Sequence, residues 1–88
     1  MNVKSDYVLR EIAGDWVLVP TGTAAAKYNG LFAVTEVGAR IIELLPECPD
    51  EEHIVSKILE EYDIDGESAR RDVAEFMSQL REHEMIEE

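Results

Sequence analysis

The sequence has few of the residues on which reactive sites depend. One cysteine and two histidines occur among 88 residues, so an internal disulfide is impossible and any cluster of nitrogen and sulfur ligands would be small. No glycine motif that cradles phosphate is present, and no local signature of Ser/His/Asp catalysis occurs. We therefore predict a protein that is not an enzyme, with no catalytic residues, no cofactor and no metal site.

Basic residues are also scarce. Twenty acidic residues stand against eight basic ones, which gives a formal net charge of −12. Binding to nucleic acids or to anionic membrane surfaces depends on cations, so both classes of partner are disfavoured. No apolar run approaches the ~18 residues that span a bilayer, and residues 1–6 do not form a secretory signal. We expect a cytoplasmic protein whose partner is a peptide or another protein.

Clear periodicities predict one folded domain over residues 1–88. β-branched and aromatic residues predict strands at 7–12, 15–19 and 31–34, the first two joined by a tight turn at Ala13–Gly14. Residues 21–29 are predicted to be a loop. Helices are predicted at 36–45, at about 51–62 and at 65–83, with Thr35, Asp50 and Asp65 as N-caps. Within the first helix, Gly38 suggests close packing. The expected order is therefore three strands followed by three helices, an α+β fold.

The helix predicted at 65–83 carries two stripes at helical spacing. The first stripe contains Ala69, Val73, Phe76 and Leu80 and is typical of a core. The second contains Arg70, Ala74, Met77 and Arg81, one residue further along. Two interpretations of the second stripe stay open at this point, namely further core with a rim of arginines, or an exposed binding surface.

Three segments, at 34–45, 54–64 and 72–80, together resemble the PqqD-like family, whose members are also called RiPP recognition elements. The resemblance extends over nearly the whole chain. Thr35 stands where the family often has Asn, which changes little because both residues cap helices. Glu84 stands where a glycine that ends the helix is common.

The resemblance implies a winged-helix-like fold with a three-stranded antiparallel sheet followed by three helices. It also implies that the chain binds the leader segment of a ribosomally synthesised precursor peptide. The leader would pair as an added strand with the third strand, in a cleft against the third helix. The chain would then present the peptide to a modifying enzyme, often a radical S-adenosylmethionine (SAM) protein, as in pyrroloquinoline quinone biosynthesis.

We expect the peptide-binding site to combine this strand with the second stripe: Leu31, Phe32, Ala33, Val34, Arg70, Ala74, Met77 and Arg81. Alternation along the strand would place Phe32 and Val34 on the core side. The two arginines predict acidic residues in the leader. On this interpretation, Met77→Asp weakens binding and leaves the fold intact.

Two alternative functions remain. One is a winged-helix regulator that binds DNA, which the carboxylates of the last helix disfavour. The other is a subunit that docks on an enzyme and does not contact peptide, which the sequence does not distinguish from a peptide-binding protein. We expect a monomer or a weak dimer, since an edge strand that accepts a peptide can also accept another copy of itself.

Overall fold

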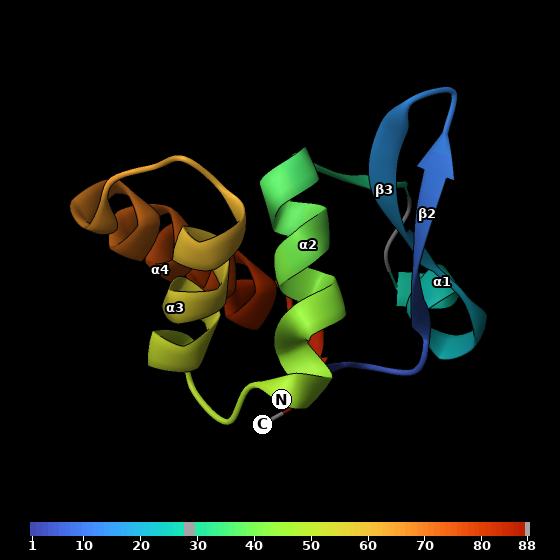
Figure 1. Cartoon of the computed structure of the whole chain (residues 1–88). Coiled ribbons are helices and arrows are strands. Elements are labelled where there is room, and N and C mark those ends of the chain that lie inside the picture. The colour runs from blue at the N-terminus through green and yellow to red at the C-terminus, as the bar shows by residue number, and fades with distance from the viewer. Residues whose placement is uncertain (28–29, 88) are drawn as a thin grey trace.

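The computed structural model describes residues 1–27 and 30–87 and has an α+β fold (Figure 1). The elements are β1 (Asn2–Val3), β2 (Tyr7–Ile12), β3 (Asp15–Pro20), α1 (Gly22–Lys27), β4 (Phe32–Val34), α2 (Glu36–Leu44), the 3-10 turn η1 (Leu45–Glu47), α3 (Glu51–Glu61), α4 (Gly66–Glu82) and β5 (Ile86–Glu87). Antiparallel strands form a sheet in the order β2-β3-β4, and β1 pairs with β5. The predicted fold class is confirmed. In the part of the chain that is described, no helix has the length and apolar character needed to cross a bilayer.

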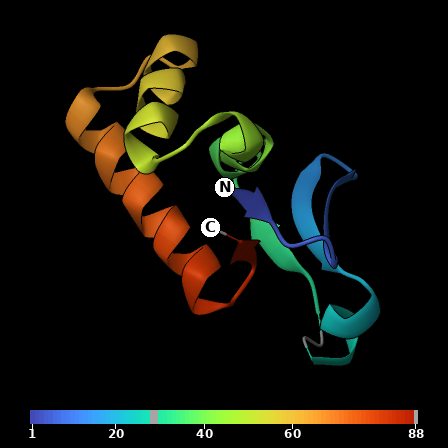
Figure 2. The same cartoon turned by 90° about the horizontal axis from the view of Figure 1, so that it is seen from below.

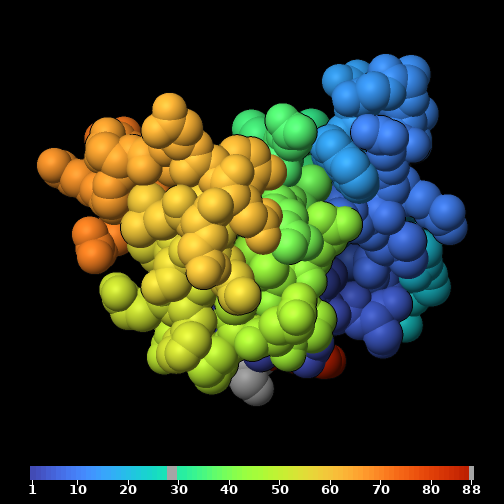
Figure 3. Space-filling view, viewed as in Figure 1, coloured from blue at the N-terminus to red at the C-terminus, as the bar shows by residue number. Residues whose placement is uncertain are grey.

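Local chemistry places the main elements where the sequence predicts them. Ala13 and Gly14 both have positive φ, 52° and 86°, which is the geometry of the two-residue turn that suits a twisted hairpin. The tip of this hairpin stands clear of the body of the molecule (Figure 3). All three predicted helix caps are confirmed, because side-chain oxygens of Thr35, Asp50 and Asp65 each accept a hydrogen bond from the backbone N–H three residues later.

The predicted loop at 21–29 is wrong in its first part, because Gly22–Lys27 forms α1. Alanine has the highest helix propensity of any residue type, so the run of alanines favours a helix. Burial of Ala24 adds a tertiary contact. The part of that prediction at residues 28–29 lies outside the described residues. The pairing of β1 with β5 is a second feature that the local pattern does not predict, since each strand has two residues and they lie at opposite ends of the chain.

The chain leaves α4 through Glu84, which adopts the left-handed conformation with φ of 55°. The N–H of Glu84 donates to the carbonyl of Arg81 at 3.0 Å, and the N–H of Met85 donates to the carbonyl of Leu80 at 2.8 Å. These two bonds are those of the Schellman ending, here formed without glycine. The turn directs Met85 and Ile86 into the core, where both are buried.

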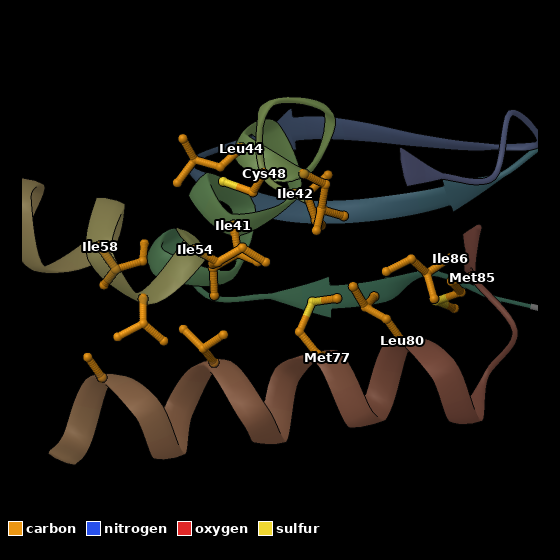
Figure 4. Packing of buried hydrophobic residues seen from close by; sticks show 14 of the residues in the cluster. Ile41, Ile42, Leu44, Cys48, Ile54, Ile58, Met77, Leu80, Met85 and Ile86 are labelled. Atoms are coloured by element: carbon orange, nitrogen blue, oxygen red, sulfur yellow. The ribbon is translucent and has the colours of Figure 1, made fainter. Parts of the chain in front are cut away.

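The core fixes the rotation of α4. Its buried residues are Ala69, Val73, Met77 and Leu80, and Figure 4 shows Met77 and Leu80 pointing from α4 into the cluster. Phe76, predicted to be core, is only half-buried, whereas Met77 has no exposed surface. The expectation that Met77→Asp leaves the fold intact is therefore wrong, because the carboxylate would be buried without a partner.

We expect Met77→Ala to lower the free energy of unfolding by about 2–5 kcal/mol, because it removes a fully buried side chain and leaves a cavity. Urea unfolding followed by circular dichroism measures this loss. The control is Met77→Leu, which nearly conserves volume and should lower stability by less than about 1.5 kcal/mol. Equal stability of the alanine variant and the wild type would contradict the burial of Met77.

Candidate functional site

The outer edge of β4 has no strand partner among the described residues. β4 pairs with β3 through Val17↔Ala33 and its two neighbours, which makes it an edge strand. Phe32 and Val34 are half-buried against the core and Ala33 is exposed, so the predicted alternation along this strand is confirmed. In an edge strand, alternate backbone N–H and C=O groups point away from the sheet. The edge can therefore accept an extended chain.

α4 lies on the open side of β4 (Figure 2). The rings of Phe32 and His83 meet edge to face, with centroids 5.4 Å apart and planes at 64°. Beside the end of β4, a pocket of about 420 Å³ opens between the start of α2 and the middle of α4. Its lining residues are Thr35, Val37, Gly38, Ile41, Asp72, Glu75, Phe76 and Gln79. We call this space the α2–α4 pocket.

Gly38 shapes the floor of the α2–α4 pocket. A Cβ atom at this position would lie 3.0 Å from Cε1 and 3.2 Å from Cζ of Phe76. These distances are shorter than most real contacts of a Cβ atom, so a side chain here would displace the ring, and the glycine allows Phe76 to pack directly on the first turn of α2. The expected close packing at Gly38 is confirmed, and its consequence is that an aromatic face lines the pocket.

The charges at the α2–α4 pocket all have one sign. Among its lining residues, Asp72 and Glu75 are charged and none is basic. Asp72 has a neighbouring cation in Arg71, with Nε and Oδ1 3.8 Å apart. No described residue forms an ion pair with Glu75. The pocket therefore combines an apolar floor with a negative rim.

A second pocket, of about 310 Å³, lies at the C-terminal end of α4, and we call it the α1–α4 pocket. One of its lining residues, His83, also makes the ring contact to Phe32, so this pocket comes close to β4. Its lining includes both signs of charge: Lys4, Asp6, Tyr7, Thr23, Ala24, Lys27, Glu82, His83 and Glu84. Residues of α4 line both pockets, and we take these pockets together with the β4 edge as the candidate site.

The predicted stripe on α4 lies elsewhere. Met77 is buried, and Arg81 forms an ion pair with Glu51 of α3, with Nη1 and Oε2 2.9 Å apart. Arg70 and Ala74 are exposed and share the flank of Arg81, because they precede it by eleven and seven residues. This flank is on the α3 side of the buried stripe, and none of its residues lines the α2–α4 pocket. The structure therefore places these residues in the core or toward α3 and not at the α2–α4 pocket.

The flank that does face β4 was missed. Asp72, Phe76, Gln79 and His83 follow one another at helical spacing, so the signal was present in the sequence. This spacing does not by itself indicate a binding surface, because Phe76 also fits a core stripe and the polar residues around it are typical of a solvated helix face.

The described residues offer little to reaction chemistry. None of them form a group of three or more His, Cys, Asp or Glu side chains that could hold a metal ion. Cys48 is buried, and burial raises the pKa of its thiol, which disfavours the reactive thiolate. The arrangement of an open strand edge beside two pockets is suited to binding an extended peptide.

Comparison with known proteins gives three findings. The family described as coenzyme PQQ synthesis protein D (PqqD) matches residues 15–86. The chain is similar to TbiB1, solved in complex with the TbiA(beta) leader peptide, with 31% identity and a TM-score of 0.74 over 99% of this chain and 95% of that one. It also shares the fold of lasso peptide synthetase B1, solved with its leader peptide, with 16% identity and a TM-score of 0.70 over 92% and 89% of the two chains.

No curated protein matches the sequence. The family match extends from the second strand of the hairpin to β5, and the similarity to TbiB1 extends over almost the entire chain. The predicted family is confirmed: the chain belongs to the PqqD family.

Proposed function

We propose that this protein binds the leader segment of a ribosomally synthesised precursor peptide and presents it to a modifying enzyme. The leader pairs with the outer edge of β4 and lies in the cleft between β4 and α4. The observation that carries the proposal is the unpaired edge of β4 beside the α2–α4 pocket. The solved complex of TbiB1 with a leader peptide supports it.

The site that we propose differs from the predicted one on α4. Leu31, Phe32, Ala33 and Val34 stay as the strand that pairs with the peptide. On the helix, Phe76 and Gln79 of the α2–α4 pocket and His83 at the ring contact replace Arg70, Ala74, Met77 and Arg81. The exposed carboxylates of α4 give no support to DNA binding, since phosphates need cations there.

The remaining parts of the proposal concern the setting in which the peptide is bound. The enzyme that receives the peptide is a peptide maturase such as a radical SAM protein. The chain itself has no catalytic activity and acts in the cytoplasm, and the single cysteine, which is buried and forms no disulfide, is in keeping with a reducing compartment.

Strand addition predicts an alternating response to N-methylation of the peptide. Every second amide of a bound strand donates to β4, and the amides between point away. In a series of leader peptides, each with one N-methyl group, methylation at alternate positions should therefore weaken binding by up to about tenfold, the value of one hydrogen bond. Isothermal titration, with leader peptides of any precursor found to be encoded beside this gene, measures the effect. The intervening positions are the internal control.

Backbone amide NMR with the same unmodified peptide locates the site. Shifts at residues 31–35 and along the Asp72–His83 flank of α4 agree with the proposal. The absence of shifts would contradict direct peptide binding and favour a subunit that docks on the enzyme. Uniform losses in the N-methyl series would leave peptide binding in place and remove strand addition.

Gly38→Ala should weaken leader binding and lower the free energy of unfolding by at most about 2 kcal/mol. The new methyl group would displace the Phe76 ring toward the α2–α4 pocket. The gain in helix propensity, about 1 kcal/mol, offsets only part of an overpacking penalty of about 1–3 kcal/mol. The control is Gly66→Ala, whose methyl group would meet only the flexible end of Arg70 at 3.3 Å. Equal affinities of the two variants for the leader would exclude the pocket floor from the site.

A further inference from the structure

We infer that the α2–α4 pocket selects a peptide segment in which an apolar side chain is accompanied by a lysine or arginine two residues away. This inference rests on the proposed function and defines the chemistry of the peptide. The charge that we infer for the peptide is the reverse of what the sequence predicts, because Arg70 and Arg81 lie on the flank away from β4 and Arg81 is paired with Glu51.

The floor of the α2–α4 pocket accounts for the apolar side chain. Val37, Gly38, Ile41 and Phe76 line it, and the pocket of about 420 Å³ can accommodate a large aliphatic or aromatic group. An extended peptide places alternate side chains on the same face, at a rise of about 3.3 Å per residue. If residue i of the peptide enters the pocket, residues i−2 and i+2 also face α4.

The negative charge at the rim of the pocket accounts for the preference for a basic residue in the peptide. Asp72 and Glu75 lie one turn apart on α4, and both are exposed at the rim of the pocket, on the solvent side of the half-buried Phe76. A peptide that covers them removes water from two carboxylates. Glu75 has no ion-pair partner among the described residues, and Asp72 has a weak one in Arg71. A lysine or arginine at i−2 or i+2 would replace the lost water with an ion pair, whereas an acidic residue there would be repelled.

The charge requirement is local to one end of the site. The α1–α4 pocket carries Lys4 and Lys27 as well as three carboxylates, so it has no comparable excess of negative charge at its rim. We therefore expect one or two basic residues close to the apolar side chain in the α2–α4 pocket, and no basic excess along the rest of the peptide. The net charge of −12 adds long-range attraction for any basic peptide, which the experiment has to separate from the local effect.

A display selection tests the inference. A library of random peptides, each about 12 residues long, is selected on three immobilised proteins: the wild type, the pocket variant Asp72→Asn/Glu75→Gln, and the control variant Glu47→Gln/Asp63→Asn. The control removes the same two charges with the same residue types, at exposed positions that do not line the pocket. Circular dichroism checks that all three proteins are folded.

We expect the wild type and the control variant to enrich peptides with a lysine or arginine two residues from an apolar residue. The pocket variant should keep the apolar residue and lose the preference for the cation. One enriched peptide, measured by fluorescence anisotropy at low salt, should bind the pocket variant about fivefold more weakly than the control variant, as expected for two solvent-accessible ion pairs.

Two other results overturn the inference, and only the first of them also overturns the proposed function. If the wild type enriches no peptide, the proposed function fails and the inference fails with it. If peptides are enriched but the cation preference is the same on the pocket variant, or is lost equally on the control variant, the local charge selection fails and peptide binding stands.

Discussion

Burial of one stripe of α4 determines what the remaining faces of this helix can do. Ala69, Val73, Met77 and Leu80 pack into the core, and this choice sets the rotation of the helix about its own axis. With Met77 in the buried stripe, Phe76 lies at the opposite edge of the stripe and lines the α2–α4 pocket. A rotation by one residue, about 100°, would bury Phe76 and bring Met77 toward a flank. The binding surface is therefore a consequence of core packing.

The same rotation separates the charges of the protein into two regions. On the α3 side, Arg81 pairs with Glu51, and Arg40 of α2 makes two hydrogen bonds to Glu61, at 2.6 and 2.8 Å. The Arg40 guanidinium holds the pKa of the Glu61 carboxyl below its usual range. These pairs connect α2 and α4 to α3. Arg40 and Arg81, which form these pairs, do not lie on the β4 side of α4. On that side, Asp72 and Glu75 have no strong cationic partner among the described residues. The negative charge of the α2–α4 pocket thus follows from the positions of the few basic residues.

Much of the fold could be predicted because its elements depend on local chemistry. The turn at Ala13–Gly14 and the caps Thr35, Asp50 and Asp65 need information from only a few residues around them. The pairing of β1 with β5 joins the two ends of the chain, and neither strand is long enough to leave a pattern. α1 was missed because Gly22 and the following Asn29–Gly30 pair are typical of a loop, although the alanines between them favour a helix.

The candidate site was half predictable for a related reason. The strand at 31–34 is identified by its own alternation, and the structure places β4 there with the expected side facing the core. The flank of α4 that faces it depends on which of two stripes, one residue apart, is buried. Both stripes contain enough apolar surface to form a core, so periodicity alone does not distinguish them. The deciding contact is between Phe76 and Gly38, which are 38 residues apart and meet only in the folded chain.

The open edge of β4 also explains why the site needs both a strand and a helix. β4 has three residues, so a peptide gains few backbone hydrogen bonds from it, and these are similar for every sequence. If a leader binds as proposed, affinity and selectivity come largely from side chains that reach α4, where Phe76 offers apolar contact and Asp72 and Glu75 offer charge. The same short edge, on a chain with a net charge of −12, is a poor partner for a second copy of itself. A short strand edge on a strongly acidic chain thus disfavours self-association.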